Sequence, residues 1–408
     1  MGLVVGDTTT VNSGGTLSIS GGSLTTPTLF LDGGTFSAPD LSGIGTFQFI
    51  NGTLNLTGPS GLTVGEGGLL GSLVTVGNDQ TLDVDNTTTI QSGSNITAVG
   101  DFSSDLLQID SCGQFDAPFG YTNNDEIQMT GSESWIMGST LTNNGFISGQ
   151  GRINASLTNN GHVNLSNGTL RFGSQVTNNT SGFISGEGTS VIRFEGGLDN
   201  SGSLILTFST STVFGNIVNN PTGLVSLAGN STANVFGDVS NNGQLYVGSG
   251  SHAVFGGHTS GSGSFPGSGT VEFSDGFSPG SSPAEGSFGG DVVLGPSSAT
   301  LMELAGTEPG EYDRLLVAGV LDVAGGLEIE LLDDFIPTLD DAFQIFEVTD
   351  LLGTFSSVLL PELSGNLSWD HSHLYSSGTL SVIPEPATLT LLPVGTLLTC
   401  GRRRAQRA

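Results

Sequence analysis

A short asparagine-rich phrase recurs through the middle of the chain at a nearly constant spacing. Its copies begin at Asn123, Asn143, Asn159, Asn178, Asp199, Asn219 and Asn241, in steps of 16 to 22 residues. A second marker keeps the same spacing, with steps of 19 to 22 residues, at Phe172, Phe194, Phe214, Phe236 and Phe255. Two independent markers that share one period of about 20 residues indicate a stack of structural repeats.

Between these markers the sequence has the features of short strands and tight turns. Polar and apolar residues alternate in 161–165 and in 169–172, which is typical of β-strands. Asn and Gly, which tolerate positive φ, separate the runs and predict corners. One such unit cannot bury its Phe, Val and Leu alone, but coils stacked on one another can. The sequence therefore predicts an all-β chain built around a parallel β-solenoid.

Stacking gives each marker an expected place in the solenoid. We expect an amide ladder from coil to coil, with side-chain hydrogen bonds between Asn143, Asn159, Asn178, Asn219 and Asn241. An alternative, compatible with the first, is that each Asn pair simply forms a turn. We also expect Phe172, Phe194, Phe214, Phe236 and Phe255 to form a single column.

The chain divides into three regions that differ in residue composition and repeat pattern. Residues 1–265 predict the solenoid, with an earlier beat at Thr16, Thr35 and Thr53 and a degraded section between about 60 and 120. No capping coil is evident at residue 1, so either a partner covers that end or the reading frame starts late. Residues 270–383 predict a C-terminal β domain, in which a β-sandwich is favoured over a continuing solenoid. Residues 384–408 form a tail.

The charge of the chain is strongly one-sided. Lys is absent, and residues 1–401 hold four Arg against 38 carboxylates, a net charge of −34. Such a surface repels phosphates, which argues against nucleic-acid binding, and it attracts divalent cations or cationic surfaces. The two Cys, Cys112 and Cys400, give neither a disulfide framework nor a metal knuckle. The residues from Met1 to Asp7 lack a basic segment and do not resemble a secretory signal.

The tail contains three elements in a fixed order. Pro384-Glu385-Pro386 comes first, an apolar stretch from Ala387 to Cys400 follows, and a basic cluster ends the chain at Arg402, Arg403, Arg404 and Arg407. The stretch is shorter than the roughly 20 residues that span a bilayer comfortably. Arg on its C-terminal side would stay in the cytoplasm, which leaves the body of the protein outside.

This tail resembles the PEP-CTERM sorting signal of bacteria. The resemblance extends upstream, because five segments are similar to the module that precedes the signal in planctomycete proteins and to autotransporter passengers: 277–283, 312–315, 342–346, 353–355 and 369–380. It implies a short hydrophobic helix, export, insertion by the tail and processing by an exosortase near Pro384-Glu385-Pro386. It also implies a final place at the cell surface or in exopolysaccharide.

The search for catalytic and binding groups yields few candidates. A hydrolase needs two carboxylates a few ångströms apart, and the candidates are Asp101, Asp105, Asp110 and Asp116. Metal candidates are the strand-like Asp370, His371 and His373, and for Ca²⁺ the oxygen groups of Asp79, Asp83, Asp85, Asn86, Asp333, Asp334, Asp340 and Asp341. For these the favoured interpretation is a solvated surface without a metal or cofactor. A lyase that binds uronate is disfavoured, since the repeats contain only Arg152, Arg171 and Arg193.

The sequence thus predicts a non-enzymatic, exported structural or adhesion protein of the cell surface or extracellular matrix. Its expected partners are an exosortase and the membrane through the tail, and exopolysaccharide through the body. The alternatives are a β-helix polysaccharide hydrolase and an adhesin that binds glycans through Tyr121, Trp135 and Tyr246.

Overall fold

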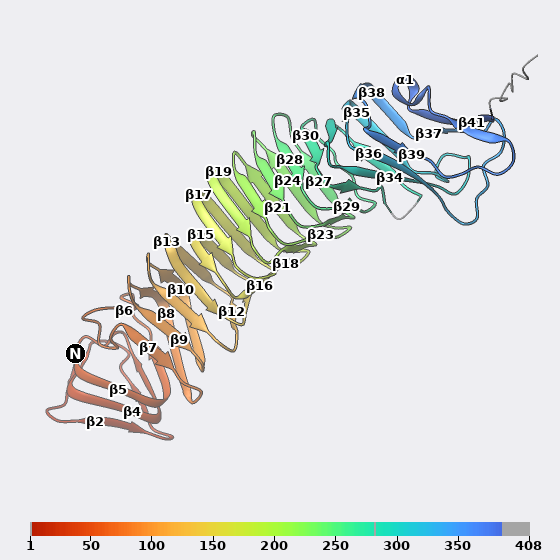
Figure 1. The fold of residues 1–408 in the computed structure, drawn as a ribbon. Coiled ribbons are helices and arrows are strands. Elements are labelled where there is room, and N and C mark those ends of the chain that lie inside the picture. The colour runs from red at the N-terminus through yellow and green to blue at the C-terminus, as the bar shows by residue number, and fades with distance from the viewer. Residues whose placement is uncertain (1, 281–282, 386–408) are drawn as a thin grey trace, which may run out of the picture.

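The computed structural model describes residues 2–280 and 283–385. About 60% of the chain is strand and 1% is helix, and the strands wind into a parallel β-solenoid of about 15 turns. Figure 1 shows the turns stacked along one axis as an elongated rod, with the first coils at one end and residues near 380 at the other. The predicted all-β solenoid is therefore confirmed.

Two large sheets with parallel pairings run along this rod. The larger sheet has 26 strands. They are β1 Leu3–Val4, β2 Thr9–Asn12, β3 Thr16–Ser18, β4 Leu24–Ala38, β5 Ile44–Leu56, β6 Leu62–Val64, β7 Leu73–Val76, β8 Gln80–Ile90, β9 Asn95–Ala98, β10 Asp101–Ile109, β11 Gln114–Ala117, β13 Glu126–Gly138, β15 Phe146–Ile153, β17 His162–Phe172, β19 Phe183–Phe194, β21 Ser203–Thr207, β22 Thr210–Val213, β24 Leu224–Ala228, β25 Thr232–Val235, β27 Gln244–Val247, β28 His252–Phe255, β30 Thr270–Phe273, β32 Glu285–Phe288, β33 Asp291–Leu294, β35 Arg314–Val323 and β38 Phe346–Gly353.

The second sheet has 12 strands, each from a successive coil. They are β12 Tyr121–Asn123, β14 Thr140–Asn143, β16 Ser156–Asn159, β18 Val176–Asn178, β20 Leu198–Asn200, β23 Ile217–Asn219, β26 Val239–Asn241, β29 Thr259–Ser260, β31 Gly276–Phe277, β34 Ala299–Leu304, β36 Gly326–Leu331 and β39 Ser357–Leu359. Early coils keep register too: Thr16 pairs with Thr35, and Thr35 with Thr53, as their spacing predicts.

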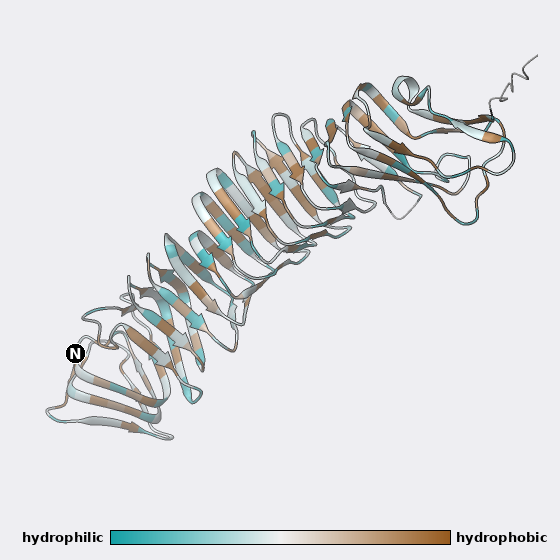
Figure 2. Ribbon diagram, viewed as in Figure 1, coloured by the Kyte–Doolittle hydropathy of each residue, from teal (hydrophilic) through white to brown (hydrophobic). Residues whose placement is uncertain are grey.

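The interior of the rod is made by the period-2 pattern of each strand. Inward and outward residues alternate, as in β28, where Ala253 and Phe255 are buried between half-buried neighbours. Figure 2 shows polar and apolar residues mixed along the strands in this way. Each inward side chain rests on those of the coils above and below, so the apolar surface of one coil is removed from water by the next.

Asparagine side chains form a buried ladder along the second sheet. Asn143 donates from Nδ2 to Oδ1 of Asn159 at 2.8 Å, and Asn159 donates in the same way to Asn178 at 2.8 Å. The ladder continues through Asn200, Asn219 and Asn241, with distances of 2.8 to 2.9 Å. It begins at Asn123, which donates to Asn143 at 2.7 Å.

The ladder amides from Asn143 to Asn219 each donate from Nδ2 to at least two oxygens. The second Nδ2 hydrogen of Asn178 reaches the carbonyl of Ser203, at 3.2 Å, and that of Asn219 reaches the carbonyl of Gln244, also at 3.2 Å. In the copy between Asn178 and Asn219, the residue that joins the ladder is Asn200. The repeated phrase in the sequence begins one residue earlier, at Asp199, so in this copy the ladder residue is the second of the phrase. The Asn pairs therefore form both a ladder and a turn.

A second, outer ladder follows one residue later and donates in the opposite direction along the rod. Asn144 donates to Asn124 at 2.9 Å, Asn160 to Asn144 at 2.8 Å and Asn179 to Asn160 at 2.6 Å. A glycine also follows the Asn pair, directly in the copies at Asn143, Asn159 and Asn241 and after two further residues in the copies at Asn178 and Asn219. A Cβ at Gly223 would lie 2.3 Å from Asn219 Oδ1, which leaves no room for any other residue there.

The single phenylalanine column predicted from the sequence is wrong. Phe172 and Phe194 are buried and stacked, with ring centroids 5.1 Å apart, and Phe255 is buried further along the same column. Phe214 and Phe236 lie one residue past this column, 50% and 59% exposed, and stack on each other outside. Because strand side chains alternate between faces, a shift of one residue moves a side chain from the core to the surface.

The region after residue 265 continues the solenoid. Strand β28 pairs with β30, β30 with β33, β33 with β35 and β35 with β38, all in parallel. The second sheet likewise runs on through β34, β36 and β39. A separate β-sandwich is thus not confirmed, and these pairings match the alternative of a continuing solenoid. The loops between strands are longer in this region, so the spacing of the repeats changes, but the stack of coils continues.

A small antiparallel sheet and a short helix close the far end of the solenoid. The sheet consists of β37 Ala342–Gln344, β40 Leu367–Asp370 and β41 Thr379–Pro384, and the helix is α1 Leu374–Ser377. Phe346 of the last coil donates its N–H to the carbonyl of Gly378, and Trp369 donates from Nε1 to Pro361. The cap thus contacts β38, the last strand of the larger sheet, where an open edge could pair with another chain.

Candidate functional site

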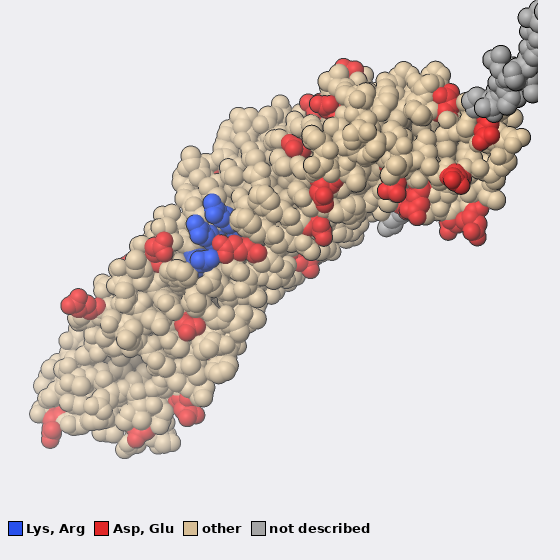
Figure 3. All heavy atoms as spheres, in the orientation of Figure 1, with Lys and Arg blue, Asp and Glu red and all other residues tan. Residues whose placement is uncertain are grey.

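Three arginines stand in one column on the outside of the rod. Arg152 in β15 pairs in register with Arg171 in β17, and Arg171 pairs with Arg193 in β19. Trp135 in β13 precedes them in the same column. Figure 3 shows these arginines as one blue patch on an otherwise acidic or neutral face. We call Trp135, Arg152, Arg171 and Arg193 the arginine column.

The arginine column borders a groove of about 300 Å³. Its lining combines a charged, an aromatic and a hydroxyl component, from Ser132, Glu133, Trp135, Gly151, Arg152, Thr169 and Arg171. The groove exists because coil corners differ in length. Trp135 comes five residues after Thr130, whereas their partners Gln150 and Arg152 are two apart, so the residues between Thr130 and Trp135 form a raised wall.

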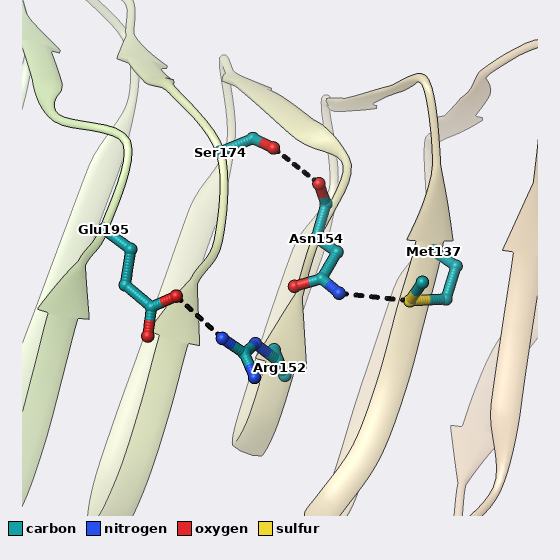
Figure 4. A network of polar contacts seen from close by, with 5 residues as sticks. All are labelled: Met137, Arg152, Asn154, Ser174 and Glu195. Atoms are coloured by element: carbon teal, nitrogen blue, oxygen red, sulfur yellow. Dashed lines mark hydrogen bonds and ion pairs between the residues drawn. The ribbon is translucent and has the colours of Figure 1, made fainter.

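Contacts inside the column hold Arg152 but leave Arg171 without an ion pair among the described residues. Arg152 Nη2 lies 2.7 Å from Glu195 Oε2, and its guanidinium carbon lies 5.4 Å from the ring centroid of Trp135. Both ion-pair partners are about 30% exposed. Figure 4 shows Arg152 reaching across the intervening strand to Glu195. The side-chain Nε atoms of Arg152 and Arg193 are buried without a hydrogen-bond partner in the described structure.

Neighbouring contacts fix the coil on which Arg152 stands. Asn154, two residues later on the same outer face, donates from Nδ2 to the sulfur of Met137 at 3.3 Å. Ser174 Oγ donates to the carbonyl of Asn154 at 2.7 Å, which ties the next coil to it (Figure 4). The guanidinium groups are therefore presented from an ordered sheet, which suits a binding surface better than loops do.

The sequence places Arg171 and Arg193 directly before two repeat markers, which indicates a shared position in the coil, but a column that includes Arg152 and Trp135 was not predicted. In a strand, the residue before an inward-facing side chain points outward. Arg171 and Arg193 directly precede the buried Phe172 and Phe194, so both arginines lie on the same outer face. Arg152 precedes Ile153 in the same way. Aligning the coils by their outward-facing residues, as well as by their inward-facing ones, would have placed the three arginines in one column.

The predicted hydrolase carboxylates are spread around one coil. Asp101 and Asp105 both lie on β10, and Asp105 occupies the point between Ser104 and Leu106 where the pairing with β8 shifts register. Asp110 accepts hydrogen bonds from Gln108 and Thr130 at the corner, and Asp116 lies on the next strand, β11. The four candidate carboxylates therefore come from two strands and the corner between them.

The predicted metal candidates adopt ordinary turn and surface roles. The strand β40 ends at Asp370, so His371 and His373 do not share a strand face, which corrects that expectation. Asp370 Oδ1 accepts from the N–H of Ser372, and this bond lowers the pKa of Asp370. Within residues 2–280 and 283–385, no group of three or more His, Cys, Asp or Glu side chains is placed to hold a metal ion.

The candidate calcium ligands also bind groups of the protein itself. Asp83 accepts a hydrogen bond from the Ser103 hydroxyl of the next coil, and Asn86 accepts from the N–H of Thr87. Asp341 accepts from the N–H of Thr338, while Asp333, Asp334 and Asp340 occupy turns with positive φ. Asp79 and Asp85 lie on either side of Asp83, before and within β8.

Of the three aromatic candidates, Trp135 alone borders the groove. Tyr121 packs inward against Phe102 and Phe115, with centroid distances of 6.1 and 4.9 Å, and burial raises its pKa above the usual range. Tyr246 is 39% exposed on β27. The three therefore do not form one aromatic surface.

The start of the sorting motif lies at the end of the last described strand. Pro384 closes β41, opposite Leu367, and Glu385 donates its N–H to the carbonyl of Asn366. Pro386, the apolar stretch and Arg402, Arg403, Arg404 and Arg407 lie outside the described residues. Among the helices of the described part, none has the length and apolar character needed to cross a membrane.

A buried carboxyl group lies near the far end of the rod. Asp313 is fully buried and accepts hydrogen bonds from the N–H groups of Ala284 and Glu303, at 2.6 and 2.9 Å. Burial raises the pKa of Asp313 from 3.8 to about 7, although the two N–H groups act to lower it. The carboxyl group ties the loop before β32 to β34.

The fold defines this chain as a parallel β-solenoid repeat protein, and its described residues form an arginine-bearing groove. No known protein family and no curated protein matches its sequence.

Proposed function

We propose that the protein is an exported, non-enzymatic structural or adhesion protein of the cell surface or extracellular matrix. The observation that carries this proposal is the unbroken parallel stack, in which every coil shares hydrogen bonds with the next from β2 to β38. Such an arrangement gives a stiff spacer, because bending it requires many backbone bonds to stretch together.

The surface of the rod is consistent with this role. It carries few charges, nearly all acidic, as the scattered red residues of Figure 3 indicate. Like charges on neighbouring rods repel and oppose side-by-side aggregation of their edges. The same negative surface repels nucleic acids, so we do not propose them as partners.

We further propose that the tail directs the protein to its place. The order of Pro384-Glu385-Pro386, apolar stretch and Arg cluster resembles the PEP-CTERM signal. In this proposal the Arg cluster keeps the tail at the inner membrane face, and an exosortase then cleaves near the motif and releases the rod outward. Exopolysaccharide is the proposed surrounding partner.

The test is expression of the chain, fused to an export signal, in hosts that carry or lack an exosortase. We expect a smaller mature mass in the exosortase host, with a C-terminus near Glu385. A variant with Pro384→Ala and Pro386→Ala is the control, and its mass should be the same in both hosts. If the unaltered chain also has one mass in both hosts, the sorting proposal fails.

A further inference from the structure

We propose that the groove beside the arginine column binds an acidic glycan, and that its uronate units lie along the rod axis. This inference concerns the isolated protein and does not depend on where the protein is located. The main observation is that three of the four arginines among residues 1–401 occupy consecutive rungs of one column.

Like charges placed opposite each other on adjacent strands destabilise a sheet. Adjacent strands are about 4.8 Å apart, so each guanidinium group of the column has a like charge one rung away. Glu195 pairs with Arg152, but no ion pair in the described residues neutralises Arg171 or Arg193. Arg314, in contrast, has no arginine in register with it on the neighbouring strands, and it forms ion pairs with Glu285 and Glu347. An anionic ligand would relieve the repulsion within the arginine column.

The lining of the groove selects among anions. Arg171 offers a planar fork of donors that matches a carboxylate. Ser132, Thr169 and Glu133 offer hydroxyl and carboxylate groups that suit the hydroxyls of a sugar, and Trp135 offers an apolar wall. A small inorganic anion has neither an apolar face for Trp135 nor the sugar hydroxyls that Glu133 could accept from. A uronate ring has a carboxylate, hydroxyls and an apolar face together.

The geometry favours a chain over a single sugar. The groove of about 300 Å³ is at the small end of the range for ligand pockets, roughly 300 to 1,000 Å³, and so suits one ring at a time. Arg193 lies one rung beyond the groove lining, where a second carboxylate would meet it. Affinity should therefore rise from one uronate unit to several as more of the column is covered.

The experiment titrates the full chain with oligogalacturonates of increasing length, with neutral maltooligosaccharides and with inorganic phosphate. Calorimetry measures the affinity of the unaltered protein. Fluorescence of Trp135 is then followed in a Trp369→Phe background, because these are the two tryptophans of the chain. We expect binding of oligogalacturonate that strengthens with length and weakens with salt, together with a change in Trp135 emission.

Two charge-matched variants separate a site from general attraction. Arg171→Gln removes the free guanidinium group and should lower the affinity at least about tenfold, the effect of one charge-assisted hydrogen bond. Arg314→Gln makes the same change in net charge away from the groove and should leave binding unchanged. Circular dichroism confirms that both variants fold.

Each outcome of these titrations either supports or overturns the proposed glycan site. Loss of binding in Arg171→Gln alone supports the site. No binding of oligogalacturonate to the unaltered protein overturns it, as does equal binding of the neutral sugars or of phosphate. Equal losses in the two arginine variants would show attraction to net charge and would also overturn it.

Discussion

The buried asparagine ladder gives the sharpest prediction about what holds this rod together. Asn178→Ala removes a donor to Asn200 Oδ1 at 2.8 Å, a donor to the carbonyl of Ser203 and the acceptor for Asn159 Nδ2 at 2.8 Å. All of these side chains are buried, so water cannot replace the lost partners.

The magnitude follows from the groups left unpaired. A buried polar group without a partner costs about 1 to 3 kcal/mol. The substitution takes the acceptor from one amide hydrogen of Asn159 and the donor from the side-chain oxygen of Asn200, so two groups at this cost give an expected loss of roughly 2 to 6 kcal/mol. Asn179→Ala is the matched control. It is the next residue, has the same chemistry and belongs to the half-exposed outer ladder, so its loss should be about 1 kcal/mol or less.

The assay combines urea unfolding with native-state hydrogen exchange. Stacked repeats need not unfold in one step, so a single midpoint is not sufficient. Exchange should show that amides of β16, β18 and β20 lose protection in Asn178→Ala, and that those of β34 and β36 keep it. If Asn178→Ala and Asn179→Ala lose the same stability, the reasoning about the buried ladder is refuted.

Three further predictions concern packing and charge. Gly223→Ala places a methyl group 2.3 Å from Asn219 Oδ1 and should cost about 1 to 3 kcal/mol in urea unfolding; an unchanged midpoint would contradict it. Phe194→Ala should cost about 3 to 5 kcal/mol and Phe236→Ala less than about 1, since only Phe194 is buried, and equal losses would refute the two-column arrangement. The raised pKa of Asp313 means that its neutral form is favoured by folding, so its contribution to stability is complete below about pH 4 and is lost as pH rises through about 7. Asp313→Asn should remove this part of the pH dependence, measured as urea midpoints across that range, and an unaltered slope would contradict it.

The repeats could be predicted from the sequence because they rest on local geometry. Asn, Gly and alternation each have a direct backbone meaning, and they agree coil after coil. Their exact phase could not be predicted in the same way. The spacing of Phe194 and Phe214 is 20 residues, but the aligned partner of Phe194 is Val213, and this one-residue difference puts Phe214 outside.

The groove and the far end of the rod were harder to predict for different reasons. The arginine column depends on register between strands, which a list of Arg positions does not give until the coils are aligned. After residue 265 the loops lengthen, for example between β34 and β35, and the 20-residue period is lost. Parallel pairing nevertheless persists, because it depends on strand patterns and not on a constant coil length.

Coil length varies at the asparagine turn and at a second corner, between the two halves of the long strands. Residues 131–134, 165–169 and 188–189 occupy this corner in different coils, while the pairings on either side stay in register. The corner therefore absorbs additional chain at little energetic cost. Foreign peptides inserted at this corner would be displayed in a row along one edge of the rod, and the choice of coil would set their position along its axis. The rod could therefore serve as a scaffold for presenting epitopes.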